Sequence, residues 1–309
     1  MFTIFVGLTP FVFITLLGFL FGRFKIFDLS HAKILNLFLY YVAVPALIIK
    51  FVAQSEIGQI DLKQIISYFL MQSICGIFTF IIASKYFKRP IPESIIWALT
   101  VALSNHVTLL LPISQIYFSE EVVTQVTSII LVDGVILLSL IAFFLELATK
   151  RNVQLIIFIK NIILNPMILS ILIGVFLFVF NFKIYDSPIE YTLSTLALCV
   201  SPVGLFAIGI ILSFHTDNVI NKLTASISIL KLLVSPLVLL LIGYVIFDAG
   251  LPQKIPGAFF VSVAPCGVTS IVLCSAYNVN PQNIIKAIFI STFASIGTIF
   301  FTIKYLSVV

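Results

Sequence analysis

Four polar side chains interrupt one of the longest apolar runs of the chain, the segment ALSNHVTLLLPIS (102–114): Ser104, Asn105, His106 and Thr108. Amide and hydroxyl groups can hold a polar ligand, and an imidazole can also carry a proton. We favour a neutral hydrogen-bonding role for His106 over a proton relay. Pro112 deletes a backbone hydrogen bond, so the segment is either a buried helix of a soluble protein or a membrane helix broken around a polar site.

A second segment, SVAPCGVTS (262–270), has a similar make-up. Pro265 breaks the backbone hydrogen bonding, Gly267 loosens the backbone, and Thr269 and Ser270 offer hydroxyls. Broken backbone at membrane depth is tolerated only where protein encloses it or where it lines a hydrated cavity. The alternative is that both segments are ordinary proline kinks.

Asp133, in SIILVDGVILLSL (128–140), is the only carboxylate near the centre of an apolar run. A charge there costs about 2.5–3.5 kcal/mol on insertion scales, so we expect Asp133 to face the protein interior and to have a partner. Two roles stay open. The carboxylate either couples transport to a proton or cation, or it is structural and caps a broken helix or bonds Ser and Thr hydroxyls.

The other reactive side chains do not form a catalytic set. No nucleophile with a base, phosphate-binding loop or metal-ligand cluster occurs in the sequence, so we expect neither an enzyme nor a metal site. We expect the four cysteines to be buried thiols: Cys75, Cys199, Cys266 and Cys274. We expect Lys231, in KLLVSP (231–236), to reach the lipid headgroups, and the second interpretation is that it gathers anions at the mouth of a site.

The composition is that of a polytopic membrane protein. The chain has 309 residues, of which 61% are hydrophobic and 9% are charged, and its mean hydropathy is +1.23. A water-soluble domain needs far more charge on its surface. The formal net charge of +5 is small and scattered, so nucleic acid is not an expected partner. The first apolar run, Thr3 to Gly22, lacks a basic leader and is interpreted as a retained span.

Ten apolar runs predict ten membrane spans: 3–22, 33–53, 63–84, 94–117, 122–148, 164–182, 189–213, 224–246, 256–277 and 282–304. One set of alternate loops holds twelve of the 17 Lys and Arg residues. The positive-inside rule places these loops in the cytoplasm and both chain termini outside it. Residues 153–163 (VQLIIFIKNII) are a candidate interfacial helix.

The first five spans (1–150) and the last five (151–309) resemble each other. Four residue pairs of the first and sixth spans match at a constant offset: Leu8 with Leu164, Pro10 with Pro166, Leu16 with Leu172 and Gly18 with Gly174. Pro45 in the second span corresponds to Pro202 in the seventh span. Because five is an odd number, the two copies must cross the membrane in opposite directions, and such an inverted repeat is typical of transporters.

The two broken segments fall at matching places of the two repeats, which is the best indication that a sequence gives of a transporter's binding site. The amides at the start of each half-helix would favour a carboxylate, and the freed carbonyls would favour a cation. We therefore predict a substrate site at the two broken segments, formed by Asn105, His106, Thr108, Pro112, Pro265, Gly267, Thr269 and Ser270.

Several stretches resemble the auxin efflux carrier family, which includes bacterial malate and malonate permeases and the plant PIN carriers. They are LNLFLYYVAVPALI (35–48), ALSNHVTLLLP (102–112), NP (165–166), PVGLFAIGIILS (202–213), KLLVSP (231–236), APCGVTSIVLCSAYNV (264–279) and IFISTFAS (288–295). The family's crossover Asn matches Asn105, and its paired prolines match Pro112 and Pro265. His106, Val107, Leu110 and Thr269 depart from the usual family residues, so the substrate is not carried over.

The resemblance implies ten spans in two inverted repeats, with broken fourth and ninth spans that cross. It also implies a scaffold of spans one, two, six and seven. Spans three to five and eight to ten would form a transport unit that carries substrate by an elevator-like shift.

The sequence therefore predicts an all-α secondary transporter of small organic anions, mono- or dicarboxylates, with Asp133 as the leading proton- or Na⁺-coupling residue and no further cofactor. Two alternatives remain: a sodium-coupled symporter of the bile-acid type, and a membrane sensor that binds its ligand without moving it. The family's distribution favours a bacterial inner membrane. A homodimer is left open.

Overall fold

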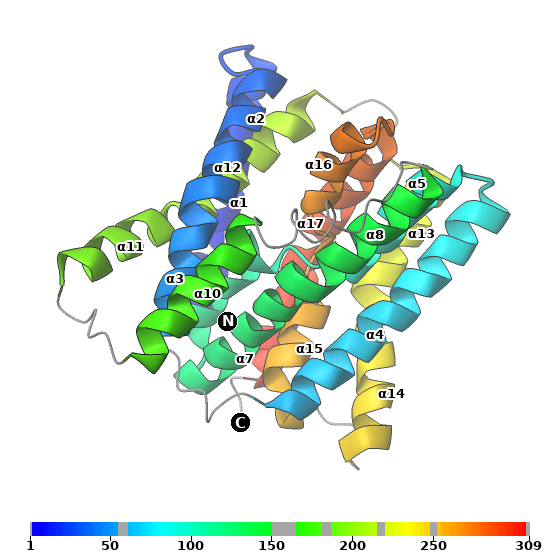
Figure 1. The fold of residues 1–309 in the computed structure, drawn as a ribbon. Helices are drawn as coiled ribbons and strands as arrows, with labels where there is room; N and C mark the ends of the chain where they lie inside the picture. Colours follow the sequence, from blue (N-terminus) through cyan, green and yellow to red (C-terminus); the bar gives the residue numbers. More distant parts are fainter. Residues whose placement is uncertain are drawn as a thin grey trace.

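A computed structural model of the chain describes residues 2–54, 61–149, 165–180, 187–214, 220–247 and 252–306. These ranges are built from helices (Figure 1), so the predicted all-α class is confirmed. Apart from the helices, the described ranges contain one isolated antiparallel bridge, between Ser104 and Cys266. The interfacial helix predicted for 153–163 lies outside the described residues.

The first half of the chain folds into helices that are mostly interrupted by single π-helical turns. These elements are α1 (Phe2–Arg23), α2 (Leu29–Phe38), η1 (Leu39–Ala43), α3 (Val44–Gln54), α4 (Leu62–Ile81), η3 (Ile82–Tyr86), α5 (Ile91–Ala102), η4 (His106–Leu110), α6 (Leu111–Tyr117), α7 (Glu120–Val132), η5 (Asp133–Leu137) and α8 (Leu138–Ala148).

The second half follows a similar pattern. Its elements are α10 (Pro166–Val179), α11 (Pro188–Leu198), α12 (Val200–Ser213), α13 (Lys222–Ile229), η6 (Leu230–Val234), α14 (Ser235–Phe247), the short 3₁₀ turn η7 (Pro252–Lys254), α15 (Pro256–Ser262), α16 (Thr269–Ala276) and α17 (Gln282–Leu306).

Local sequence signals explain where many helices begin. The side chains of Asp61 and Asn221 accept hydrogen bonds from backbone N–H groups in the first turns of α4 and α13. Pro166, Pro188 and Pro256 occupy the first positions of α10, α11 and α15. Proline fits there because the N–H groups of the first turn have no partner within the helix.

Six helical segments in the described ranges are long and apolar enough to cross a membrane: Leu29–Gln54, Leu62–Tyr86, Glu120–Ala148, Pro188–Ser213, Lys222–Ile246 and Gln282–Leu306. They correspond to predicted spans two, three, five, seven, eight and ten. Predicted span six appears as a shorter apolar helix, α10 (Pro166–Val179), and predicted span one corresponds to α1, which is apolar over Gly7–Arg23. Predicted spans four and nine are each divided into two helices.

The helices form two groups, seen side by side in Figure 1. The first group contains α1, α2, α3, α10, α11 and α12, with α1 packed along α12 and α3 packed along α10. Glycine permits both close approaches. A Cβ on Gly18 of α1 would lie 2.1 Å from the carbonyl oxygen of Phe206, and a Cβ on Gly174 of α10 would lie 2.6 Å from the Cβ of Val52.

The second group contains α4 to α8 and α13 to α17, and most of the largest cluster of buried apolar side chains lies within it. Bonds from buried glutamines join its distant helices. Gln125 of α7 accepts a hydrogen bond from the N–H of Gly257 at 3.1 Å, and Gln64 of α4 accepts one from the N–H of Ala258 at 3.2 Å. The start of α15 is thereby fixed to α4 and α7.

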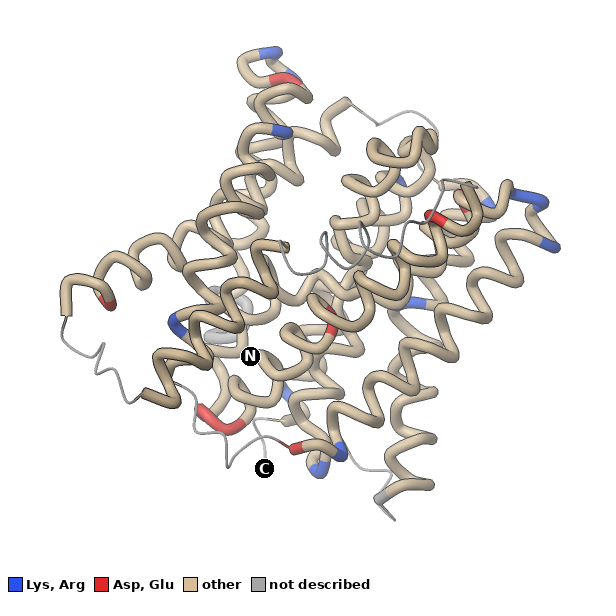
Figure 2. The backbone as a smooth tube through the Cα atoms, viewed as in Figure 1, with Lys and Arg blue, Asp and Glu red and all other residues tan. Residues whose placement is uncertain are grey.

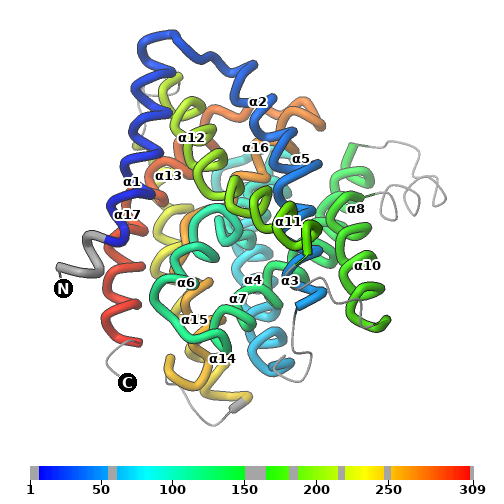
Figure 3. Tube along the Cα trace, turned by 90° about the vertical axis from the view of Figure 1, so that its left-hand side faces the viewer, coloured from blue at the N-terminus to red at the C-terminus, as the bar shows by residue number. Residues whose placement is uncertain are grey.

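Charged residues concentrate at the ends of the helices (Figure 2). The turn after α1 and the far end of α4 carry Lys and Arg, and the start of α7 carries two glutamates. Both chain ends lie in the lower half of the views in Figures 1 and 3. The predicted orientation in a membrane stays a prediction.

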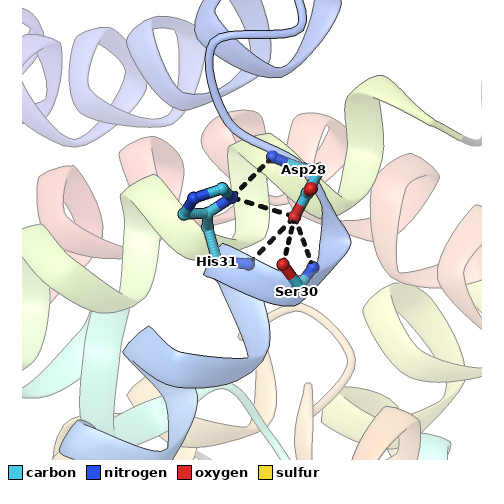
Figure 4. Close-up of polar contacts among 3 residues, drawn as sticks. All are labelled: Asp28, Ser30 and His31. Atoms are coloured by element: carbon cyan, nitrogen blue, oxygen red, sulfur yellow. Dashed lines mark hydrogen bonds and ion pairs between the residues drawn. The ribbon is translucent and has the colours of Figure 1, made fainter.

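Asp28 fixes the turn between α1 and α2 (Figure 4). Its Oδ1 accepts hydrogen bonds from the backbone N–H groups of Ser30 (2.7 Å) and His31 (3.1 Å) and from the Ser30 hydroxyl (2.6 Å). Its own N–H donates to Nδ1 of His31 at 3.2 Å. These bonds, the Ser30 hydroxyl first, hold the pKa of Asp28 well below its usual value.

Candidate functional site

Two helices stop near the middle of the second group. α5 ends at Ala102, and Leu103 adopts extended backbone (φ −79°, ψ 127°) before helix resumes at His106. α15 ends at Ser262, and helix resumes at Thr269. The interruptions predicted in the fourth and ninth spans are confirmed.

Proline explains only one of these interruptions. Pro265 lies between α15 and α16, as predicted. Pro112 is the second residue of α6 and lies beyond the gap that follows α5. The prediction that Pro112 breaks the fourth span is therefore wrong in position. Pro112 lies inside the continuous helix η4–α6, which accommodates the missing N–H next to the π-helical turn.

The two interruptions lie against each other as short antiparallel segments. The N–H of Asn105 donates to the carbonyl of Pro265 at 3.0 Å, and the N–H of Gly267 donates to the carbonyl of Leu103 at 2.8 Å. Glycine is needed at 267, because a Cβ there would lie 2.8 Å from the Leu103 carbonyl oxygen. These bonds bring together two segments about 160 positions apart in the sequence. We call the place where these two segments, 103–105 and 265–267, lie against each other the crossing.

Four helix ends meet at the crossing. The C-terminal ends of α5 and α15 present carbonyl groups, and the helices that follow, η4–α6 and α16, begin there with N–H groups that lack helical partners. Carbonyl ends carry partial negative charge and amide ends carry partial positive charge. The crossing therefore offers one environment suited to a cation and another suited to an anion.

Asn105 is buried at the crossing and holds an unused donor. Its Oδ1 accepts a hydrogen bond from the hydroxyl of Thr108, which orients the amide. Its Nδ2 is buried without a hydrogen-bond partner among the described residues. Thr108 also contacts α12 of the first group, where a Cβ on Gly204 would lie 2.5 Å from the Thr108 Cγ2 atom. The amide thus lies next to the boundary between the two groups.

His106 and Asp133 form a buried pair beside Asn105. The Nε2 of His106 lies 3.0 Å from Oδ2 of Asp133, and their side chains are 6% and 1% exposed. The expectation that Asp133 faces the interior and has a partner is confirmed. The other carboxylate oxygen, Oδ1, is buried with no hydrogen-bond partner in the described part of the chain. A neutral or protonated imidazole is compatible with this contact, so both interpretations of His106 remain open.

Lys231 does not reach the headgroups, and that expectation is wrong. The side chain is fully buried, and its ammonium donates to the carbonyl of Val101 at 2.9 Å and to Oγ of Ser104 at 2.7 Å. Val101 lies in the last turn of α5, where carbonyls lack helical partners. The lysine therefore belongs to the crossing.

Ser104 connects Lys231 to the second broken helix. Its hydroxyl donates to the carbonyl of Val261, in the last turn of α15, at 3.0 Å. The Tyr68 hydroxyl of α4 lies 2.9 Å away, and it must be the donor because the single Ser104 proton is already committed. Ser104 thus uses its one proton and both lone pairs.

Three π-helical turns place these ionisable groups. η4 begins at His106, η5 begins at Asp133, and η6 contains Lys231. A π turn inserts one residue into a helix and shifts the side chains around it, and such turns occur frequently at functional sites. The ionisable groups of the crossing thus coincide with local departures from α-helix.

The remaining predicted site residues have less direct roles. Thr269 begins α16 and is partly exposed, while Ser270 is buried and donates its hydroxyl to the carbonyl of Gly267 at 2.8 Å. The structure therefore brings Asn105, His106, Thr108, Asp133, Pro265 and Gly267 together, but not Pro112. Across the described ranges, no group of three or more His, Cys, Asp or Glu is placed to hold a metal ion.

Sequence reasoning missed Lys231, Ser104 and Tyr68 as members of the site. A signal for Lys231 existed, because it is a lone charge within the apolar run SISILKLLVSP (226–236), as Asp133 is in its own run. Ser104 lay inside the polar segment but was given no role. For Tyr68 we find no sequence signal, since its contact depends on how α4 packs.

A comparison with models of protein families matches residues 3–303 to the family described as membrane transport protein. The match includes both broken segments and the segments of Asp133 and Lys231. A comparison with curated proteins finds no match.

Proposed function

Because the chain belongs to the membrane transport protein family, which is the auxin efflux carrier family its motifs resemble, we propose that it is a secondary active transporter of small organic anions. Mono- or dicarboxylates bind at the crossing. The family supports transport itself, and the geometry of the crossing supports the choice of an anion.

One observation carries the proposal: two buried polar atoms at the crossing have no partner in the described chain. These atoms are Nδ2 of Asn105, a donor, and Oδ1 of Asp133, an acceptor. Buried polar groups in proteins are almost always hydrogen-bonded, and an unpaired one costs about 1–3 kcal/mol. A ligand or water that enters the crossing satisfies them.

The free donor suits a carboxylate. The amide N–H of Asn105 cannot accept a bond, so it selects an acceptor, and its Oδ1 is already occupied by Thr108. The amide ends of η4 and α16 add partial positive charge at the crossing. A bound carboxylate would thus meet a hydrogen-bond donor and a favourable field.

The His106–Asp133 pair supplies a site for a coupled proton. A proton shared by the imidazole and the carboxylate changes the charge beside the bound anion, so anion and proton binding favour each other. In this role the pair binds a proton on one side of the membrane and releases it on the other.

The two groups of helices suit an elevator-like movement. The first group corresponds to the proposed scaffold and the second to the proposed transport unit. The named bonds between distant helices stay inside one group: Gln64 to Ala258, Gln125 to Gly257 and Lys231 to Ser104 within the second, and Gln54 to Glu190 within the first. At the boundary between the groups lies an apolar pocket, and the residues that line it include Leu109, Ile113 and Leu205. The named bonds thus join helices within each group, whereas this part of the boundary between the groups is apolar.

The packing of the first group supports an inverted repeat. In the two proposed repeats, span one corresponds to span six, and span two corresponds to span seven. The pair α1 with α12 then becomes the pair α10 with α3, and both pairs are observed, each with a matching glycine at Gly18 or Gly174. Both termini outside the cytoplasm, a bacterial inner membrane and a homodimer remain parts of the proposal that rest on the sequence.

Two alternatives lead to different outcomes in one experiment. Purified protein is reconstituted in liposomes, and uptake of labelled mono- and dicarboxylates is measured under an imposed proton gradient or an imposed sodium gradient. We expect accumulation driven by the proton gradient. Accumulation that needs sodium would favour the bile-acid type of symporter, and carboxylate binding without flux would favour a sensor.

A further inference from the structure

Lys231 is a buried cation in the middle of the crossing. It is fully buried, and within the described ranges no carboxylate lies at ion-pair distance from its ammonium. Burial of an ammonium is costly unless other groups replace its hydration. Two oxygens of the crossing do so, the Val101 carbonyl and the Ser104 hydroxyl.

The ammonium occupies the place where a metal cation would be expected. Transporters with broken helices bind Na⁺ at unwound carbonyls and at the C-terminal ends of half-helices. Here the C-terminal end of α5 gives the Val101 carbonyl directly to Lys231, and the end of α15 is joined to it through Ser104 and the Val261 carbonyl. Both negative helix ends are thus connected to one fixed positive charge.

The buried charges also balance. In the described chain the fully buried residues with a formal charge are Lys231 and Asp133, and the two interact electrostatically. The other groups near the ammonium are Tyr68, Cys75 and Cys266, which are neutral when protonated. A sodium ion added to this site would leave an excess positive charge in a region of low dielectric constant.

We propose that the Lys231 ammonium is a tethered cation, which fills the position of a coupling sodium ion, and that transport by this protein is therefore independent of sodium. The inference rests on the proposed transport function and excludes sodium as its coupling ion. In this role Lys231 is a positioning residue, because it holds the two helix ends in register and does not itself touch the carboxylate.

The first test uses the wild-type protein. Proteoliposomes are loaded and bathed in choline chloride or in sodium chloride, and uptake of the transported carboxylate is measured at a fixed proton gradient. The expected rates agree within about twofold, because a sodium ion has no free site to bind. A decrease of about tenfold or more in choline would overturn the proposal while the transport function stands.

The second test removes the tethered charge with Lys231→Met, which keeps the length of the side chain. Uptake in choline should fall by about tenfold or more, and sodium or methylammonium should restore a measurable part of it by entering the vacated position. Lys222→Met is the matched control, because Lys222 is exposed at the start of the same span. Its uptake should match the wild type in both salts.

Thermal unfolding in detergent gives a readout that does not depend on transport. Sodium should raise the melting temperature of Lys231→Met relative to choline and leave the wild type unchanged, since only the variant has a vacant cation position. A folded variant that neither salt rescues nor stabilises would show a merely structural lysine and would contradict the proposal.

If Lys231→Met does not fold, the comparison of the wild type in the two salts decides. A sodium-induced increase in the melting temperature of the wild type contradicts the proposal, and the absence of an increase supports it. If the wild type takes up no carboxylate, the transport function fails, and this comparison still tests the cation site.

Discussion

Asn105 is the residue whose chemistry the proposed function depends on most. Its amide is oriented by Thr108 and keeps one buried N–H unused. We expect Asn105→Ala to weaken carboxylate binding by about tenfold to a hundredfold, since a hydrogen bond to a charged group contributes about 1.5–3 kcal/mol. The measurement is the increase in melting temperature with ligand concentration in detergent.

The control for Asn105→Ala is Gln115→Ala, because Gln115 has an exposed amide on α6 within the same span. The control should bind as the wild type does. Equal affinity of Asn105→Ala and wild type for the carboxylate would show that the Asn105 amide does not bind it.

Asp133 is expected to matter for energy coupling more than for binding. Asp133→Asn keeps the shape of the side chain and its contact with His106 but removes the charge that holds a proton. We expect the variant to lose accumulation driven by a proton gradient while it still exchanges labelled for unlabelled carboxylate at equal pH. Uptake and exchange are measured in the same proteoliposomes.

Glu120→Gln serves as the matched control for Asp133→Asn, because Glu120 is an exposed carboxylate at the start of the same span. It should keep both activities. Proton-driven accumulation by Asp133→Asn at the wild-type level would show that the carboxylate is structural, which is the alternative left open by the sequence.

At the level of helices, two glycines set the closest contacts of the first group. A Cβ at Gly18 would lie 2.1 Å from a backbone oxygen of α12, and a Cβ at Gly174 would lie 2.6 Å from Val52 of α3. We expect Gly18→Ala and Gly174→Ala each to lower the unfolding free energy by about 1–3 kcal/mol, because the helices must move apart. Thermal unfolding in detergent measures the loss.

Gly297→Ala is the internal control for these variants. Gly297 lies inside α17, and an added Cβ would meet no atom within 4 Å. The Gly297→Ala variant should be as stable as the wild type, or more stable by about 0.5–1 kcal/mol. A Gly18→Ala protein as stable as Gly297→Ala would mean that the α1–α12 contact is looser than described.

The start of α2 gives a prediction about pH. Hydrogen bonds from Ser30 and His31 lower the pKa of Asp28 in the folded protein, so the stability it contributes is present above its unfolded pKa, about 3.9. That stability is lost only as the pH falls through the lower, folded value. We therefore expect Asp28→Ala to lower the melting temperature at every pH from 8 to about 5.

Asp28→Asn separates the hydrogen bonds of the cap from its charge, because asparagine is an equally good N-cap residue. It should recover most of the melting temperature lost in Asp28→Ala. A difference between wild type and Asp28→Ala that already shrinks between pH 8 and 6 would contradict the lowered pKa.

The sequence predicted the helices better than it predicted the contacts of their side chains. Apolar runs interrupted by polar residues and prolines predicted two interrupted spans, although only Pro265 lies at the break it predicted. The exact break after Ala102 was missed, since it depends on the bond of Asn105 to Pro265 in a distant segment. Lys231 was misplaced for a related reason: its acceptors, Val101 and Ser104, belong to another helix.

At the scale of the molecule, the proposed movement of one helix group against the other can be tested with a cross-link. A Cβ at Gly134 of η5 would lie 3.4 Å from the sulfur of Met167 in α10, which is in the other group. We expect Gly134→Cys/Met167→Cys, made in a protein without its native cysteines, to lose transport when a short thiol cross-linker joins the pair. Transport should return on reduction of a cleavable linker.

Gly76→Cys/Ala102→Cys is the matched control, because both positions lie in the second group and a Cβ at Gly76 would be 3.6 Å from that of Ala102. This spacing fits a disulfide. Cross-linking there should leave transport largely intact. Undiminished flux through the Gly134–Met167 cross-link would rule out relative movement at that boundary.

The proposed two repeats were inferred from matched residues such as Gly18 and Gly174, and the structure shows a close helix contact at each of these glycines. Which helices those glycines contact could not be predicted, since that depends on how the two halves interleave.

The most direct measurement is a cryo-EM map of the protein with the transported anion bound. The anion's carboxylate should lie at the crossing, within hydrogen-bond distance of Nδ2 of Asn105 and close to the His106–Asp133 pair. The Lys231 ammonium should remain on Val101 and Ser104. An anion bound elsewhere, with the Asn105 amide still unpartnered, would contradict the account.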